Sequence, residues 1–363
     1  MDKSRNRTLY FDVIKILAML LVIYTHSGEY GAGRFALLHA EGGWSFYAHL
    51  TGNVVCKVAV PLFFMVSGAL LLDKEESLLY LLRKRVCRFA LVLVLFTVLQ
   101  FAWRSCTTGT PFYIAPAVNQ ILAGYGSVSG WAYPASYWFL YAYLVFLLFL
   151  PIHRKMVQNM SIEHFVYVLI LSFLFLAILP MLCCLSNHGR AIAPQILGYT
   201  GFLGQWILYP TLGYFIAKRI PHSFISRRIL LILGGASVLS VLIALLLTAW
   251  NISVEPIRDA HLHLLHKGFI IIPSCFIFVS FRRLFQKIES CSLSGRFILF
   301  FSQLSLCVML LEENSRFIIK NLIINHIHTP PTITSTCYIF LSYFLACFIG
   351  SILRMIPGVK RIL

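Results

Sequence analysis

Charged residues are scarce in this chain of 363 residues. Asp, Glu, Lys and Arg together make up 12% of it, against about 25% in an ordinary soluble domain, whereas 59% of the residues are hydrophobic. Acidic residues are the rarest class, because 13 Asp and Glu accompany 30 Lys and Arg. This composition excludes a soluble globular domain and predicts an integral membrane protein.

Several patterns that would point to other classes of protein are also missing. The ten cysteines include no Cys-x-x-Cys pair, and most fall in apolar stretches, where a thiol acts as a small apolar group. Cys106, Cys183 and Cys184 are predicted to lie toward the outer face of the membrane, but we expect no disulfide among them. No polar linker separates soluble domains, and no inverted repeat of the transporter kind is evident. We therefore expect a single transmembrane domain over residues 1–363.

Long apolar stretches recur along the whole chain. Since about 20 apolar residues cross the hydrocarbon core once, they predict an all-α, polytopic bundle of about ten membrane-spanning helices. The stretch at 137–151 is short, and we expect its helix to begin near Ala132. The predicted spans are 8–26, 48–72, 86–103, 137–151, 164–184, 196–216, 228–249, 267–285, 297–315 and 335–353.

The basic residues alternate between the predicted loops. Of the 30 Lys and Arg, 21 fall on one side and 7 on the other, with Lys15 and Lys57 inside spans. Because Lys and Arg stay cytoplasmic, this asymmetry predicts that both termini lie in the cytoplasm. The net charge of +17 therefore reflects topology, and we expect no nucleic-acid partner. The first span holds Asp12 and Lys15 and precedes no A-x-A site, so we expect it to be retained rather than cleaved.

The first span, which contains "DVIKILAMLLVIYTH", carries three ionisable groups: Asp12, Lys15 and His26. On a helix, Lys15 and His26 differ by about 20° around the axis and about 16 Å along it, and Asp12 lies on the same stripe. An intramembrane charge costs about 2.5–3.5 kcal/mol, so such a stripe usually faces a wet cavity or the protein interior. The spacing predicts a polar cavity, with His26 near its outer end.

Each of these groups has two interpretations. A neutral imidazole with a pKa near 6.5 can take a proton from an attacking hydroxyl, but a lone histidine at a helix end also serves as a hydrogen-bonded interfacial residue. Lys15 can bind a phosphate, or can form a satisfied ion pair with Asp12. Three aligned ionisable groups favour the functional interpretation of His26.

At these residues the sequence resembles the acyltransferase 3 family of membrane acyltransferases. The resemblance runs in order from residue 5 to about 220 and rests on five segments. They are Asp12, Lys15 and His26; "PLFFMVSGALL" with Pro61, Phe63, Phe64, Ser67 and Gly68; "LLRKRVCRF" with Arg85 and Arg88; "YWFLYAYLVFLLFLP" with Trp138, Phe139 and Pro151; and "LGYFIAKR" around Gly213.

Two departures from the family pattern stand out. Where the family often has a histidine before the tryptophan, this chain has Ser136 and Tyr137. Where the family commonly has a tyrosine and a histidine near the ninth span, this chain has Met309 and Glu312. The roles of the late helices are therefore not carried over from the family.

The resemblance implies a membrane O-acyltransferase in the cell membrane, a bacterial inner membrane or a plasma membrane. Such an enzyme moves an acyl group, most simply acetyl, from cytoplasmic acyl-CoA (acetyl-CoA) to a hydroxyl of a surface or lipid-linked carbohydrate. Acyl-CoA, the glycan acceptor and membrane lipid are the expected partners. The alternatives are a multi-pass transporter or exporter of a glycan precursor, or a structural component.

The resemblance also implies a role for particular residues. His26 is the expected catalytic residue, either as a general base or as an acylated intermediate. Arg85 and Arg88, with Lys15, are expected to bind the donor, because guanidinium forks hold phosphates, although basic residues in this loop also set topology. We expect Asp12, Ser67 and Trp138 as supporting residues, together with Glu312, whose role does not come from the family pattern.

The supporting residues have structural alternatives. Ser67 and Gly68 suit close helix packing, Trp138 suits an aromatic belt or a sugar ring, and Glu312 can neutralise Arg316 four residues on. We expect no metal, although His261, His263 and His266 lie together in an outer loop.

Overall fold

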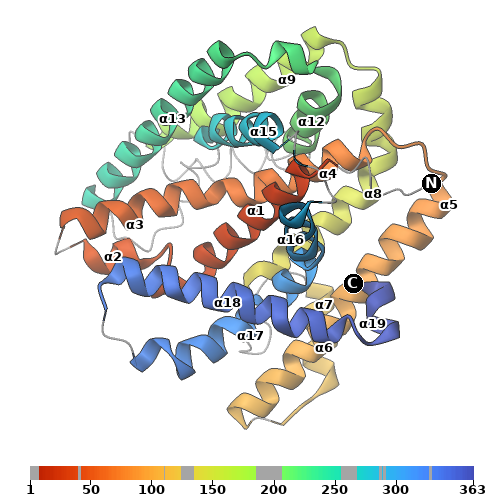
Figure 1. The fold of residues 1–363 in the computed structure, drawn as a ribbon, viewed down its shortest axis with the longest axis vertical. Helices are drawn as coiled ribbons and strands as arrows, with labels where there is room; N and C mark the ends of the chain where they lie inside the picture. Colours follow the sequence, from red (N-terminus) through yellow and green to blue (C-terminus); the bar gives the residue numbers. More distant parts are fainter. Residues whose placement is uncertain are drawn as a thin grey trace.

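The computed structural model describes residues 8–39, 42–109, 111–123, 135–184, 207–254, 268–285, 288, 292–326 and 329–363. Over these residues every regular element is a helix, so the predicted all-α class is confirmed. Helix α1 (Tyr10–His26) lies at the centre of the bundle (Figure 1). It contacts α4 (Ala59–Leu71), α15 (Ile271–Phe285), α16 (Leu293–Gln303), α17 (Ser305–Leu322) and α18 (Pro331–Leu353).

The other helices surround this centre (Figure 1). They are α2 (Arg34–Leu38), α3 (Gly43–Val55), α5 (Leu78–Leu81), α6 (Cys87–Thr108), α7 (Ile114–Ala123), α8 (Trp138–Gln158), α9 (Ile162–Phe173), α10 (Leu179–Cys184), α12 (Leu208–Tyr214), α13 (Arg227–Val254) and α19 (Pro357–Ile362). Short 3-10 or π turns extend several of them, including Cys56–Val58 between α3 and α4, Leu82–Val86 before α6, and Ala135–Tyr137 before α8.

Six helical segments among the described residues are long and apolar enough to cross a membrane, and a bent pair raises this to seven. The predicted count of about ten is therefore not confirmed. Helix α1 has 17 residues, at the lower limit of a crossing, and α15 has 15. The six segments are Gly43–Leu71, Leu78–Thr108, Trp138–Gln158, Ile162–Cys183, Arg227–Trp250 and Pro331–Leu353.

The bent pair replaces the span predicted at 297–315. There α16 and α17 meet at an angle of 62°, with Leu304 between them. The apolar pattern gave no sign of this bend, because a hydropathy window averages across a break between two helices. Since α17 contacts both α1 and α18, the bend lets polar residues of α17 lie beside the end of α1.

Helices α4 and α12 pack through two glycines. A Cβ atom on Gly68 would collide with the carbonyl oxygen of Pro210, and one on Gly213 would collide with the carbonyl oxygen of Met65. The backbones therefore approach as closely as small residues in membrane helices allow. This contact accounts for Gly68 and Gly213 by packing.

Substitution of either glycine tests this packing. Gly68→Ala and Gly213→Ala force a methyl group against backbone, so each is expected to destabilise the protein by about 1–3 kcal/mol or more. Gly235→Ala is the matched control, because Gly235 lies exposed in α13 and an added Cβ there meets nothing within 4 Å. Thermal unfolding of the detergent-solubilised variants measures the difference; equal midpoints for all three would contradict the packing.

Candidate functional site

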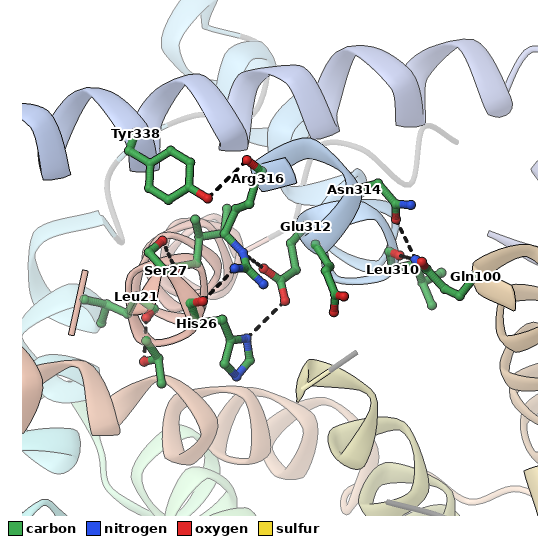
Figure 2. A network of polar contacts seen from close by, with 12 residues as sticks. Leu21, His26, Ser27, Gln100, Leu310, Glu312, Asn314, Arg316 and Tyr338 are labelled. Carbon is green, nitrogen blue, oxygen red and sulfur yellow. Dashed lines mark hydrogen bonds and ion pairs between the residues drawn. The ribbon is translucent and has the colours of Figure 1, made fainter. Parts of the chain in front are cut away.

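His26 ends α1 and contacts a carboxylate from the other end of the chain. Its Nδ1 lies 3.1 Å from Oε1 of Glu312, which is on α17 and fully buried. Figure 2 shows the imidazole below α1 with one nitrogen toward Glu312. The two residues are 286 positions apart, so only the folded chain brings them together.

Arg316 completes this cluster. Its Nε donates to Oε2 of Glu312 at 2.6 Å, and its Nη1 donates to the backbone carbonyl of His26 at 2.6 Å (Figure 2). The carbonyls in the last turn of a helix lack intrahelical partners, so Arg316 satisfies one of them at the end of α1. The hydroxyl of Tyr338 on α18 in turn donates to the carbonyl of Arg316 at 3.1 Å. The predicted Glu312–Arg316 pair exists, and it also positions His26.

The cluster determines which nitrogen of His26 is free. A carboxylate paired with a guanidinium only accepts hydrogen bonds, so Nδ1 of His26 carries the proton that Glu312 receives. In the neutral imidazole the lone pair then lies on Nε2, and in Figure 2 the second ring nitrogen points away from Glu312. An imidazole held in this way is oriented as a base.

His26 lines a cavity of about 260 Å³. Its polar lining includes Lys57 and Ser136, and Trp138 at the start of α8 contributes an aromatic wall. Apolar side chains such as Val60 make up much of the rest. We call this space the His26 cavity.

A second cavity, of about 300 Å³, is lined by four basic residues: Lys15, Lys84, Arg85 and Arg88. Ser67 also lines it, and its hydroxyl lies 3.5 Å from the hydroxyl of Tyr143. We call this space the basic cavity. The structure thus brings together all three residues that the sequence predicted to bind the donor.

The two cavities are neighbours. Phe63, Phe139 and Met309 line both of them, so the cavities lie on either side of these three side chains. The rings of Phe63 and Phe139 are 5.6 Å apart between centroids. His26 and Lys15, on one helix, therefore line two adjacent cavities, whereas their shared face predicted a single polar cavity.

Lys15 is held by an acid at the start of α1. Its Nζ lies 2.8 Å from Oδ1 of Asp12, which also accepts from the hydroxyl of Ser302 on α16 at 2.5 Å. Asp12 is buried, whereas the Lys15 side chain keeps 22% of its surface exposed. Lys15 therefore forms the ion pair with Asp12 and lines the basic cavity at the same time. From the sequence, these were two alternative interpretations of Lys15.

Arg85 and Arg88 both have protein partners. Glu76, in the turn between α4 and α5, pairs with Arg85 and also accepts from Arg154 at 2.8 Å. The hydrogen bond from Arg85, with that from Arg154, lowers the pKa of Glu76 to about 2 against the effect of burial. Glu76 thus stays charged at neutral pH. Nε of Arg88 donates to the carbonyl of Ile362 in α19 at 2.8 Å, which leaves its other nitrogens available.

Other expectations have mixed outcomes. Cys106 and Cys183 are free thiols, and the side chain of Cys184 lies outside the described part of the chain. The described part of the chain holds no cluster of three His, Cys, Asp or Glu that could bind a metal. His261, His263 and His266 lie outside the described residues, as does Ala132, the expected start of its span. The roles assigned to the site residues stay predictions.

The sequence left three residues of the cavities without a role. Lys57 stood out only as a lysine inside a span, and Ser136 and Met309 only as departures from the family pattern. An unexplained intramembrane charge is itself a signal of function, so Lys57 was identifiable in principle. Met309 carries no such signal, because an apolar residue in a helix suits packing equally well.

One family model matches nearly the whole chain. The model of the acyltransferase 3 family, described as "Acyltransferase domain", covers residues 8–354. No curated protein and no solved structure shows significant similarity to the chain.

The buried cluster gives a stability prediction. Arg316→Met leaves the buried Glu312 without its guanidinium partner, and breaking a buried ion pair costs about 3–5 kcal/mol. Arg104→Met is the matched control, because it removes an ion pair with Glu313 whose side chains are about a quarter exposed and costs about 0–1 kcal/mol. Unfolding midpoints of the purified variants compare the two; similar losses would mean that the Glu312 cluster does not depend on Arg316.

Proposed function

This chain belongs to the acyltransferase 3 family, and from that premise we propose that it transfers an acetyl group from acetyl-CoA to a hydroxyl of a surface or lipid-linked carbohydrate. Its class is a multi-pass membrane acyltransferase, given the family match over residues 8–354 and the apolar helices. We propose a cell membrane, bacterial inner or plasma, as its location. No observation favours the alternative of a glycan exporter.

The basic cavity supports acyl-CoA as the donor. Four cationic side chains around one cavity suit the phosphates of coenzyme A, since guanidinium and ammonium groups donate charge-assisted hydrogen bonds to phosphate oxygens. Arg85 gives two of its nitrogens to Glu76, whereas the ammonium of Lys15 has three donors and one acidic partner, Asp12, so Lys84, Arg88 and Lys15 are the better candidates for direct contact. Arg85 then contributes its charge to the cavity.

The observation that carries the proposal is the adjacency of the two cavities along α1. Lys15 and His26 are eleven residues apart, or about 16 Å along a helix axis. This separation suits an extended pantetheine arm whose phosphates lie near Lys15 and whose thioester lies near His26. The arm would pass Phe63, Phe139 and Met309, which line both cavities.

The chemistry follows from the free nitrogen of His26. The acceptor hydroxyl attacks the thioester carbonyl carbon while Nε2 of His26 takes its proton. The tetrahedral intermediate then collapses, the carbon–sulfur bond breaks, and the thiolate of coenzyme A leaves and receives a proton from the imidazolium. The products are the ester and free coenzyme A.

Glu312 supports direct transfer over an acyl-histidine intermediate. A carboxylate 3.1 Å from Nδ1 stabilises the imidazolium that forms when Nε2 takes a proton. An acylated Nε2 has no lone pair left to take the proton of the acceptor hydroxyl, so the route through an acyl-histidine would need a second base. We therefore propose His26 as the general base and Glu312 as its positioning residue.

The His26 cavity supports a sugar acceptor. Trp138 lies on its wall, and an indole ring offers an apolar face against which a sugar ring can pack. The volume of about 260 Å³ suits a small group such as acetyl beside part of a sugar.

Loss of the base is the central test. In cells that lack the gene, His26→Ala is expected to restore none of the acetylation that the wild type restores, because loss of a general base lowers the rate by about 10²–10⁴-fold. His164→Ala, at an exposed histidine, is the matched control and should restore it fully. Mass spectrometry of surface glycans, searching for a difference of one acetyl group, provides the measurement. Full restoration by His26→Ala would refute the mechanism.

The donor site gives a kinetic prediction. Arg88→Ala should raise the KM for acetyl-CoA about tenfold or more and change kcat little, since it removes a charged hydrogen bond that binds the ground state and the transition state alike. Arg83→Ala is the control, because Arg83 is an exposed neighbour that does not line the basic cavity. Steady-state kinetics of the purified enzyme separates the two, and equal effects would show that only the overall charge of the turn matters.

A further inference from the structure

Lys57 is a cation inside a membrane span for which the proposed reaction has no use. It lies in the turn Cys56–Val58, within the helical segment Gly43–Leu71, and lines the His26 cavity. It forms no hydrogen bond or ion pair with the described residues, although its charge acts on the neighbouring Cys56 thiol. A charge at membrane depth is costly, so an unpaired one that faces a cavity indicates a ligand.

Ser136 is a second polar group without a partner in the same cavity. Its side chain is 2% exposed, and its hydroxyl has no hydrogen-bond partner among the described residues. A buried hydroxyl without a partner is unfavourable unless a ligand or water satisfies it. Ser136 follows α7 in the chain and Lys57 precedes α4, so two separate segments bring these groups to one cavity.

No described residue that lines the His26 cavity is an acid that could neutralise Lys57. None of these lining residues is Asp or Glu, and Glu312 is already bound to His26 and Arg316. The phosphates of the donor have their own cations in the basic cavity. Among the described residues Lys57 thus has no counter-ion, and the other substrate is a source of one.

We infer that Lys57 and Ser136 bind an anionic group of the acceptor, a carboxylate or a phosphate close to the hydroxyl that is acylated. This inference rests on the proposed function, because it takes the His26 cavity as the acceptor site. An ammonium group and a hydroxyl together offer several donors to such an anion. The acceptor is thus an acidic or phosphorylated sugar rather than a neutral one.

Binding of matched sugars tests the inference. Glucose, glucuronate and glucose 1-phosphate are titrated against the full-length protein with coenzyme A at saturation, so that the basic cavity is filled. The wild type is expected to bind at least one charged sugar about tenfold or more tightly than glucose, in line with a charge-assisted hydrogen bond. The two charged sugars distinguish a carboxylate from a phosphate.

Variants assign the preference to its residues. Lys57→Met should abolish the preference for the charged sugar, Lys57→Arg should keep it, and Ser136→Ala should reduce it several-fold. Lys155→Met, at an exposed lysine outside both cavities, is the matched control and should leave it unchanged. Retained binding of coenzyme A shows that each variant is folded; should Lys57→Met fail this check, Lys57→Gln takes its place.

Several results would overturn the inference. Equal affinity for the three sugars, no binding of either charged sugar, or an unchanged preference in Lys57→Met each exclude an anion site at Lys57. A loss that is equal for neutral and charged acceptors in turnover would instead assign Lys57 to the reacting carbonyl. Binding needs no turnover, so failure of the proposed acetyl transfer shows separately in the His26→Ala experiment.

Discussion

The contact between His26 and Glu312 is the interaction on which the rest of the site depends. A carboxylate that is fully buried in a membrane protein needs charged or hydrogen-bonding partners, and Glu312 obtains them from His26 and Arg316. Because Arg316 also bonds the end of α1, the same cluster joins the first helix to α17 and orients the imidazole. The bend between α16 and α17 belongs to this arrangement, since α17 carries both Glu312 and Arg316.

Helix α1 contributes an ionisable side chain to each of the two cavities. One end carries Lys15 beside Asp12, in a cavity with three other basic residues, and the other end carries His26, in a smaller cavity with Lys57 and Trp138. Three apolar side chains line both cavities. A single rigid helix therefore sets the distance between the basic cavity and the imidazole of His26, whereas residues on separate loops would need each position to be held independently.

Several features of the fold and of the candidate site were predictable from local sequence patterns. The aligned Asp12, Lys15 and His26 indicated a polar interior face, because a helix repeats in a known way and charges avoid lipid. The basic cluster at Arg85 and Arg88 could likewise be identified from the sequence. The number of spans was less predictable, since hydropathy detects apolar stretches but not breaks such as that at Leu304, and two of the predicted spans are short helices in the structure. Gly68 was correctly weighed as a packing residue, but its partner, Pro210, was not identifiable.

The sequence by itself determined the all-helical membrane class, the family, and the polar face of the first helix, because composition, ordered motifs and helical periodicity are local properties of a chain. Only the tertiary structure decided that Glu312 contacts His26, that Glu76 pairs with Arg85, and that Lys57 and Ser136 line the His26 cavity. Such pairings join residues far apart in the chain. They depend on how helices cross and bend, and no spacing within one segment encodes that.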